Sequence, residues 1–333
     1  GAIASSIVII RPSALINNYY LLHVLKSFIG KIMIERVENG TAQPNISAAN
    51  VKNYLIPIPP ITEQKKIVQK LDTLEKYIQQ YTLLHQEVET KKKQFPLSLE
   101  KSLLQYAMQG KLVEQNEKDE PANQLVERIK EEKVKLMEQK VIKKEKLIPP
   151  ITEEEAPFEI PSSWKWISLG EISQITSGST PLKSNTLYYK NGGIPWVTSS
   201  STNLDIVTDS EVKITEKALK ECSLTLHPPG TLIMAMYGQG KTRGQVSELG
   251  ISATTNQACA AIRLYLEDEY HKKYIRYNLK RVYNQIREQA AGGAQPNLNL
   301  SKIKSILIPL PPLFEQKRIV DKIEKLLALT KSL

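Results

Sequence analysis

A stretch of 32 residues occurs twice in this chain, at a constant offset of 252 residues. The first copy runs from Gln43 to Leu74 and reads QPNISAANVKNYLIPIPPITEQKKIVQKLDTL, and the second runs from Gln295 to Leu326 and reads QPNLNLSKIKSILIPLPPLFEQKRIVDKIEKL. The two copies are identical at 16 positions. In each copy an apolar, strand-like run ends in Pro-x-Pro-Pro and a helical pattern follows. The duplication therefore predicts two related units, each of which passes into a helix at the same point.

The similarity extends upstream of the two copies, and then it stops. Ala2 to Arg11 is short and β-branched and predicts a strand, and the apolar spacing from Asn17 to Glu35 predicts a helix packed on it. Their counterparts are Ile262-Arg263 and the stretch from His271 to Arg287. Before Ala258 the second copy has a long strand-rich region that the first copy lacks. We therefore expect the first unit to be truncated, whether by a shortened or recombined gene or because the sequence is part of a longer protein.

The clearest helical pattern runs from Glu63 to Glu89, after Pro59-Pro60 and with Thr62 as a plausible N-cap. Its apolar side alternates spacings of four and three, which is typical of a coiled-coil seam. The seam positions are Ile67, Leu71, Leu74, Ile78, Tyr81, His85 and Val88. His85 fits a polar residue that sets register better than a pH switch.

Further helical patterns follow at 97–109, with Gly110 as a C-cap, and from Asp119-Glu120-Pro121 to about Lys146. Together with the first helix they predict a long helical hairpin that acts as a spacer. The second copy repeats the seam from Ile319 to Leu333, so two matching helices should pair with each other or with the hairpin.

A Pro- and Glu-rich linker from Leu147 leads to the second globular unit, from Trp164 to Pro312. Strand-like runs in that unit are separated by clusters of Gly, Ser and Thr, which predicts a mixed α/β or β-rich domain with long polar loops. The predicted strands are 194–197, 231–236, 258–266 and 306–310.

The net charge of the chain is +10. Residues 161–312 contain 17 lysines and arginines against 11 aspartates and glutamates, a net charge of +6, and the helical stretch 61–146 has +3. A basic globular unit favours a polyanionic partner, most simply nucleic acid, although solubility alone is an alternative. Two distant cysteines and the absence of a long apolar run indicate a cytoplasmic protein with reduced thiols.

The residues from Ala235 to Thr242 (AMYGQGKT) fit a relaxed Walker A pattern. A phosphate-binding loop needs a helix that starts at the Lys-Thr pair, and the following RGQVSELGISATTNQ has no helical period. We therefore interpret this stretch as a glycine-rich loop whose side chains contact bases and phosphates, with a surface hairpin as the alternative. The candidate contacts are Tyr237, Gln239, Lys241, Thr242, Arg243 and Gln245.

Three further polar stretches are candidates. The loop SGSTPLK suits phosphate contacts, although it could be an ordinary turn. Asn256-Gln257 could bracket adenine or equally cap a strand end. The third stretch comprises Tyr188-Tyr189, Trp196 and residues 198–201, in which Trp196 is better explained as core than as a stacking platform. The candidate DNA contacts here are Ser177, Ser179, Thr180, Lys183, Thr198, Ser199, Asn256 and Gln257.

The sequence gives little support for catalysis. The four histidines and two cysteines have no metal-ligand spacing, and no HExxH motif, nucleophile elbow or S-adenosylmethionine motif is present. The residues therefore predict no metal or cofactor, and a catalytic site assembled from distant residues stays open.

Several motifs, taken in order, resemble the specificity subunits of type I restriction–modification systems, and the resemblance covers nearly the whole chain. They are IPSSWKWISLGEI, SGSTP, GGIPWV, MAMYGQGKTRGQV, ATTNQACAAI and QPNLN followed by IPLPPLFEQKRIV, with LLQYAMQGKLVEQ and DEPANQLVERIKEE in the helical part. Each is weak alone, but their order is specific.

The resemblance implies an α+β fold in which α/β target-recognition domains are joined by long antiparallel coiled-coil helices. The resemblance also implies that this chain is not an enzyme, because the family's specificity subunit has no catalysis of its own. In that family each recognition domain reads one part of a bipartite DNA target and the helices dock modification (M) subunits. The M subunits methylate adenine with S-adenosylmethionine, and restriction (R) subunits join through the complex.

Applied to this chain, the resemblance divides it into five parts: the remainder of a first recognition domain (1–61), a central helical spacer (62–146), a linker (147–160), a complete second recognition domain (161–312) and a C-terminal spacer helix (313–333). The first domain lacks counterparts of SGSTP, GGIPWV and YGQGKTRGQ. Reading of a full bipartite target by this chain alone is therefore in doubt. Two alternatives remain: pairing of truncated chains, and a non-catalytic coiled-coil scaffold with impaired DNA reading.

Overall fold

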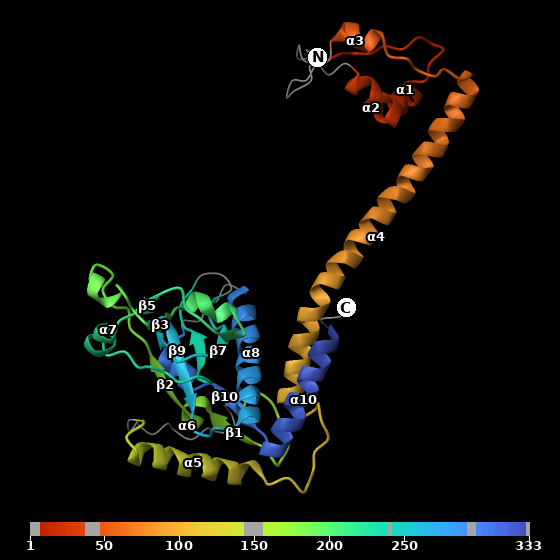
Figure 1. The fold of residues 1–333 in the computed structure, drawn as a ribbon. Helices are drawn as coiled ribbons and strands as arrows, with labels where there is room; N and C mark the ends of the chain where they lie inside the picture. Colours follow the sequence, from red (N-terminus) through yellow and green to blue (C-terminus); the bar gives the residue numbers. More distant parts are fainter. Residues whose placement is uncertain (1–6, 37–46, 143–155, 239–241, 292–297, 331–333) are drawn as a thin grey trace. The chain divides into compact units, whose positions relative to one another are not determined.

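The computed structural model describes residues 7–36, 47–142, 156–238, 242–291 and 298–330 (Figure 1). Contacts divide the chain into two compact units, Gly1–Gln94 and Phe95–Leu333, which we call unit 1 and unit 2. The boundary falls inside the longest helix. The five-part division expected from the sequence stays a prediction. No helix in the described part of the chain is long and apolar enough to cross a membrane.

Unit 1 is small and helical. It contains α1 (Asn18–Lys26), α2 (Phe28–Glu35), α3 (Ala48–Lys52) and the first part of α4 (Ile61–Met108). Tyr20, Val24 and Val68 form its core. The single helix predicted over 17–35 is interrupted at Ser27, whose extended backbone ends α1 and whose hydroxyl accepts from the backbone N–H of Ile29 to cap α2.

The strand predicted for Ala2–Arg11 was wrong over its described part. Residues 7–11 have no regular secondary structure and are exposed. Their counterpart in unit 2 is a strand buried between two neighbouring strands. A β-branched run needs such neighbours to form a ladder, and the described residues of unit 1 provide none.

The helix α4 runs without interruption from Ile61 to Met108, although Pro96 lies inside it. The two patterns predicted separately at 63–89 and 97–109 are therefore one helix, in which Pro96 removes a single backbone hydrogen bond. In unit 1 the predicted seam is largely exposed, with Ile78 and Tyr81 at 64% and 69%. In unit 2 the end of the helix is buried through Leu104, Ala107 and Met108.

Unit 2 is built on a five-stranded sheet in the order β2-β9-β6-β7-β4. A three-stranded sheet, β5-β3-β8, and a two-stranded sheet, β1-β10, complete it. All four strands predicted within this unit are present, as β3, β6, β9 and β10. The strand bounds are Lys165–Ser168 (β1), Ser173–Ser177 (β2), Ile194–Val197 (β3), Ile206–Val207 (β4), Lys213–Ile214 (β5), Leu232–Ala235 (β6), Val246–Leu249 (β7), Thr254–Thr255 (β8), Cys259–Leu264 (β9) and Leu307–Leu310 (β10).

Helices surround these sheets (Figure 1). A separate hydrophobic cluster joins α7 to β3 and β5, whereas the main core joins α5, α8 and α10 to the five-stranded and two-stranded sheets. The amphipathic helix α5 buries Leu125 and Ile129 in that core, as their spacing predicted, but it ends at Glu138 rather than near Lys146. The predicted third helical stretch therefore belongs to the body of unit 2. The remaining helices are α6 (Leu169–Ile172), η2 (Thr186–Tyr188), η3 (Ser199–Asn203), α7 (Glu216–Glu221), α8 (Glu269–Ala291), α9 (Leu300–Lys304) and α10 (Leu313–Thr330).

The repeated motif has the same role in both units. Gln64 and its counterpart Gln316 are fully buried in the first turns of α4 and α10. Each donates to the carbonyl of the preceding repeat-equivalent proline, Pro59 at 2.8 Å and Pro311 at 2.9 Å. The glutamine side chain thereby satisfies a backbone acceptor at the junction between the extended run and the helix. In each unit this hydrogen bond fixes the direction of the helix relative to the extended run before it.

Candidate nucleic-acid interface

Four loops leave the five-stranded sheet and its neighbour at one edge. The register Ser177↔Ala260 places the end of β2 beside the start of β9. The start of β9 pairs in turn with the end of β6, which leads by a hairpin into β7. Because β3 and β8 are parallel, residues 198 and 256 also leave neighbouring strands at the same end. The described residues of the segments 177–183, 198–203, 237–245 and 256–257 therefore gather at this edge, which we call the loop edge.

All the residues predicted as DNA contacts belong to these four segments. Gln239 and Lys241 lie outside the described residues. Of the twelve others, five are exposed: Ser177, Thr180, Lys183, Tyr237 and Gln257. The other seven are half-buried: Ser179, Thr198, Ser199, Thr242, Arg243, Gln245 and Asn256.

The first loop, 177–183, packs closely on the fourth segment, 256–257, and on the end of β8 before it. A Cβ on Gly178 would lie 1.7 Å from the carbonyl oxygen of Thr255, so only glycine permits this approach. The backbone N–H of Ser179 donates to that same oxygen at 3.1 Å. The hydroxyl of Thr180 donates to the side-chain oxygen of Gln257. These contacts fix the two loops against each other as a single polar surface.

Asn256 and Trp196 have structural roles in this arrangement. The side-chain oxygen of Asn256 accepts from the backbone N–H of Ala258 at 3.1 Å, so the strand-capping alternative is realised. Trp196 is 6% exposed and its indole N–H donates to the carbonyl of Ser179 at 3.0 Å. It belongs to the core, as the sequence indicated, and supports the first loop from below.

The glycine-rich loop is a hairpin loop. Residues 243–244 form a turn, Gly244 has φ +83°, and β7 begins at Val246. No helix starts at Thr242, so the requirement of a phosphate-binding Walker loop is not met. The side-chain oxygen of Gln245 accepts from the hydroxyl of Thr202 at 3.4 Å, which connects this loop to η3.

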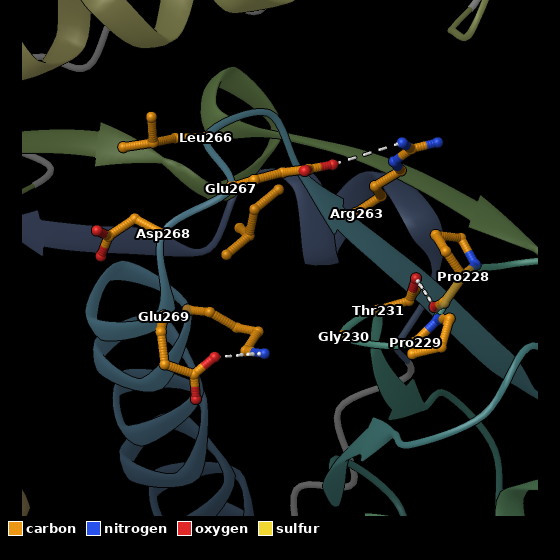
Figure 2. Close-up of a pocket in the computed structure, with 11 residues that line it drawn as sticks. Pro228, Pro229, Gly230, Thr231, Arg263, Leu266, Glu267, Asp268 and Glu269 are labelled. Carbon is orange, nitrogen blue, oxygen red and sulfur yellow. Dashed lines mark hydrogen bonds and ion pairs between the residues drawn. The ribbon is translucent and has the colours of Figure 1, made fainter.

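The two edges of the sheet differ in charge. The sequence of the four loop-edge segments includes two lysines and one arginine and no aspartate or glutamate. At the opposite edge, a surface pocket of about 430 Å³ lies between the end of β9 and the start of β6. Figure 2 shows three consecutive carboxylates there, of which Glu267 lies beside Arg263 while Asp268 and Glu269 lie away from it. Glu269 pairs with Lys272 at 2.9 Å, so three carboxylates face two cations in this pocket. Charge therefore favours a polyanion at the loop edge over the opposite edge.

A second cavity, of about 500 Å³, borders the loop edge and was missed by the sequence reasoning. Gln245 belongs to its lining, together with Lys280 and Asn284 of α8. Lys280 forms an ion pair with Asp205 at 2.8 Å. In the sequence, Lys280 and Asn284 are polar residues four apart on a helix, which is the pattern of an ordinary solvated face. Their place in this cavity follows from the packing of α8 beside β7, which the sequence does not show.

The histidines and cysteines of unit 2 are structural. Burial lowers the pKa of His227 to about 4, and burial raises the pKa of the Cys259 thiol to about 12. His271 is fully buried beside Gln316, with its pKa lowered by desolvation. Within the described part of the chain, no group of three or more His, Cys, Asp or Glu side chains could hold a metal ion.

Unit 2 is thus an α+β unit that includes the end of a long helix, and the sequence of its loop edge has basic and amide residues and no carboxylates. The type I restriction modification DNA specificity domain model matches residues 3–90 and 161–333, and the chain belongs to this family.

Curated relatives agree with this assignment, and a solved structure shares the fold. The EcoEI specificity subunit of Escherichia coli is 30% identical over 94% of this chain and 61% of its own length. The MjaIX specificity subunit of Methanocaldococcus jannaschii is 31% identical over 48% of the chain and 37% of its own. A solved structure concerned with complex assembly and conformational transition of the type I restriction–modification system has a similar fold. The match covers 96% of this chain and 65% of the chain in that structure, with 20% identity and a TM-score of 0.50. The chain thus spans about three fifths of the EcoEI subunit.

Proposed function

We propose that this chain recognises a DNA sequence through the loop edge of unit 2, as a specificity component of a type I restriction–modification complex. One observation carries the proposal. Four segments that are distant in the sequence meet at one edge with serines, threonines, amides and basic side chains and without carboxylates. Such side chains are the ones that bind phosphates and base edges.

The loops divide into two proposed roles. Ser177, Ser179, Thr180 and Lys183, with Thr198 and Ser199, contact the phosphate backbone and set the register. Arg243 and Gln245, with Gln239 and Lys241, reach base edges, because arginine or lysine suits guanine and glutamine suits adenine. Tyr237, which is 50% exposed, and Gln257 complete the surface.

The remaining activity belongs to partners. We propose that modification subunits bind the helices α4 and α10, that restriction subunits join through the complex, and that S-adenosylmethionine binds the partner rather than this chain. The exposed apolar residues of α4 support a partner surface there. The chain itself then has no catalytic role and acts in the cytoplasm.

The test begins with selection of a duplex from a random library, since the target sequence is unknown. Against the selected duplex, Lys241→Ala or Arg243→Ala is expected to weaken binding by about 1–3 kcal/mol if the residue reads a base. Lys130→Ala, which removes one charge from α5, serves as the control. Unchanged affinity of both loop variants in a salt-controlled titration contradicts the assignment.

The second candidate is a non-catalytic scaffold with impaired DNA reading, which the exposed seam of α4 favours. A competition experiment separates the two. If the chain is a specificity component, only an unlabelled duplex of the same sequence displaces the labelled target. If it is a scaffold with a basic surface, an unlabelled duplex of any sequence displaces the target equally.

A further inference from the structure

Leu182 is an exposed aliphatic residue on the loop edge. It is 67% exposed and lies in the first loop, between Thr180 and Lys183. Among the described residues of the four loop-edge segments, the only other aliphatic side chain is that of Pro181, which is buried. The surface proposed to bind DNA therefore presents one aliphatic side chain among its polar groups.

The backbone around Leu182 is fixed from both sides. The hydroxyl of Tyr189 donates to the carbonyl of Pro181 at 2.6 Å. The carbonyl of Leu182 accepts from the backbone N–H of Asn185 at 3.0 Å, which closes a turn. The indole of Trp196 holds the start of the same loop. The side chain of Leu182 therefore projects from a supported backbone, which lowers the entropy cost of ordering it against a ligand.

The same turn carries positive charge. Between residues 172 and 204 the sequence contains Lys183 and Lys190 and no aspartate or glutamate. Lys183 follows Leu182 directly and is exposed, and Leu187 in η2 is a second exposed leucine, at 60%. Phosphates are thus attracted to a turn that also displays apolar surface. An exposed apolar side chain next to a cation is a combination that proteins insert between bases to kink a duplex.

We propose that Leu182 is a wedge that inserts between two stacked base pairs of the bound duplex. This assignment rests on the proposed function, because it requires DNA at the loop edge. Leu182 enters from the minor groove, separates one base step and bends the helix axis, while Lys183 binds a phosphate beside that step. Insertion removes the exposed leucine from water, which offsets part of the lost base stacking.

A wedge contributes to sequence specificity without a hydrogen bond to any base. Pyrimidine–purine steps such as TA and CA unstack more easily than other steps, so the insertion of Leu182 costs least there. The chain should therefore prefer such a step at one fixed position of its target, in addition to the bases that polar side chains contact. Leu182 is in this way a specificity-determining residue of the loop edge.

The experiment uses the full chain and the duplex selected from the random library. A fluorescent purine analogue, whose emission is quenched by stacking, replaces each purine in turn, and dyes at the two duplex ends report bending by energy transfer. Binding is expected to raise the emission at one step and to raise the energy transfer. Leu182→Ser is expected to abolish both changes and to weaken binding about tenfold, because the burial of one leucine is lost. Since Leu182 is exposed in the free chain, urea unfolding should show unchanged stability.

Two variants and one altered duplex serve as controls. Leu182→Met keeps an apolar wedge and should keep both changes. Leu226→Ser removes another exposed leucine, at 46%, which precedes β6 and lies outside the loop-edge segments, so it should bind and bend the duplex like the unaltered chain. A mismatch at the reporting step weakens stacking there, and should strengthen binding of the unaltered chain but not of Leu182→Ser.

The outcomes separate the wedge from DNA recognition itself. Sequence-selective binding without a change of emission at any step overturns the wedge alone, as does a Leu182→Ser protein that keeps the emission change. If that protein binds more weakly and still keeps the change, the leucine contacts a thymine methyl group instead. If no duplex is selected, the proposed function fails and the wedge fails with it.

Discussion

Gly178 illustrates how one position controls the candidate interface. Its Cα lies so close to the carbonyl oxygen of Thr255 that no side chain fits between the loops. The neighbouring Ser179 and Thr180 are held by bonds to Thr255 and Gln257. Any side chain at 178 must therefore displace both loops together.

The substitution Gly178→Ala is expected to lower the free energy of unfolding by about 1–3 kcal/mol, as for other overpacked sites. It should also weaken DNA binding, because the polar surface shifts. Gly193→Ala is the control, since a Cβ at Gly193 meets no atom within 4 Å. Urea unfolding measures the difference, and equal stability of the two variants contradicts the close approach.

The residues of the loop edge could be predicted from the sequence, but their convergence at one edge could not. The residues of the loop edge were predicted one stretch at a time from their composition, because Ser, Thr, Asn and Gln between apolar runs indicate exposed loops. Their convergence depends on strand order, which no local pattern contains. Lys280 and Asn284 were missed because their side of α8 is polar like any solvated face.

Among the elements, α8 is attached to the sheet by alternating charges. Lys272 pairs with Glu248 at 2.7 Å, and Arg276 and Lys280 pair with Asp205 at 2.7 and 2.8 Å. The hydrogen bond from Lys280 lowers the pKa of the Asp205 carboxyl. Because a carboxyl with a depressed pKa stabilises the fold only while ionised, this contribution is present above the ordinary pKa of aspartate and is lost as the pH falls through the lowered value.

Replacing Asp205 by Asn is expected to lower the free energy of unfolding at neutral pH by no more than about 1 kcal/mol, because the aspartate is 69% exposed and its pairs are screened by solvent. The difference should shrink in high salt. The comparison is with Asp209→Asn, whose pair with Lys213 is longer, at 3.8 Å, and more exposed. A difference that persists undiminished in 1 M salt, about 3 Å of screening length, contradicts an electrostatic origin.

The elements differ in how far their sequences specified them. The strands β3, β6, β9 and β10 were predicted because each is an apolar run between turn residues. The strands β4, β5 and β8 have two residues each, too few to carry any periodicity. The run at 2–11 had the composition of a strand but no strand beside it among the described residues, which shows that a strand is specified by its neighbours as much as by itself.

The chain as a single polypeptide combines two units of unequal size. All three tryptophans, Trp164, Trp166 and Trp196, lie in unit 2, whereas helix is present in both units. Spectroscopic probes therefore report different parts of the chain. Two-state behaviour is not expected when compact units unfold separately.

Far-UV circular dichroism reports the helix content of both units, whereas tryptophan fluorescence reports unit 2 alone. In a guanidinium titration, the circular dichroism signal is expected to begin to change at a lower denaturant concentration than the fluorescence. The reason is that unit 1 has a small core, formed by Tyr20, Val24 and Val68. Superimposable curves from the two probes would show that the units unfold together. The fluorescence transition of Ile58→Lys, a change in unit 1, should match that of the unaltered chain.

The contrast between the two sheet edges has a consequence for the approach to DNA. Unit 2 has an electric dipole, because its loop edge is basic and amide-rich and the opposite edge carries Glu267, Asp268 and Glu269. The electric field of a duplex rotates this dipole before contact, so a larger share of collisions begins with the loop edge facing the DNA. The association rate should then fall with salt more steeply than the net charge alone requires, since ions screen the torque as well as the attraction.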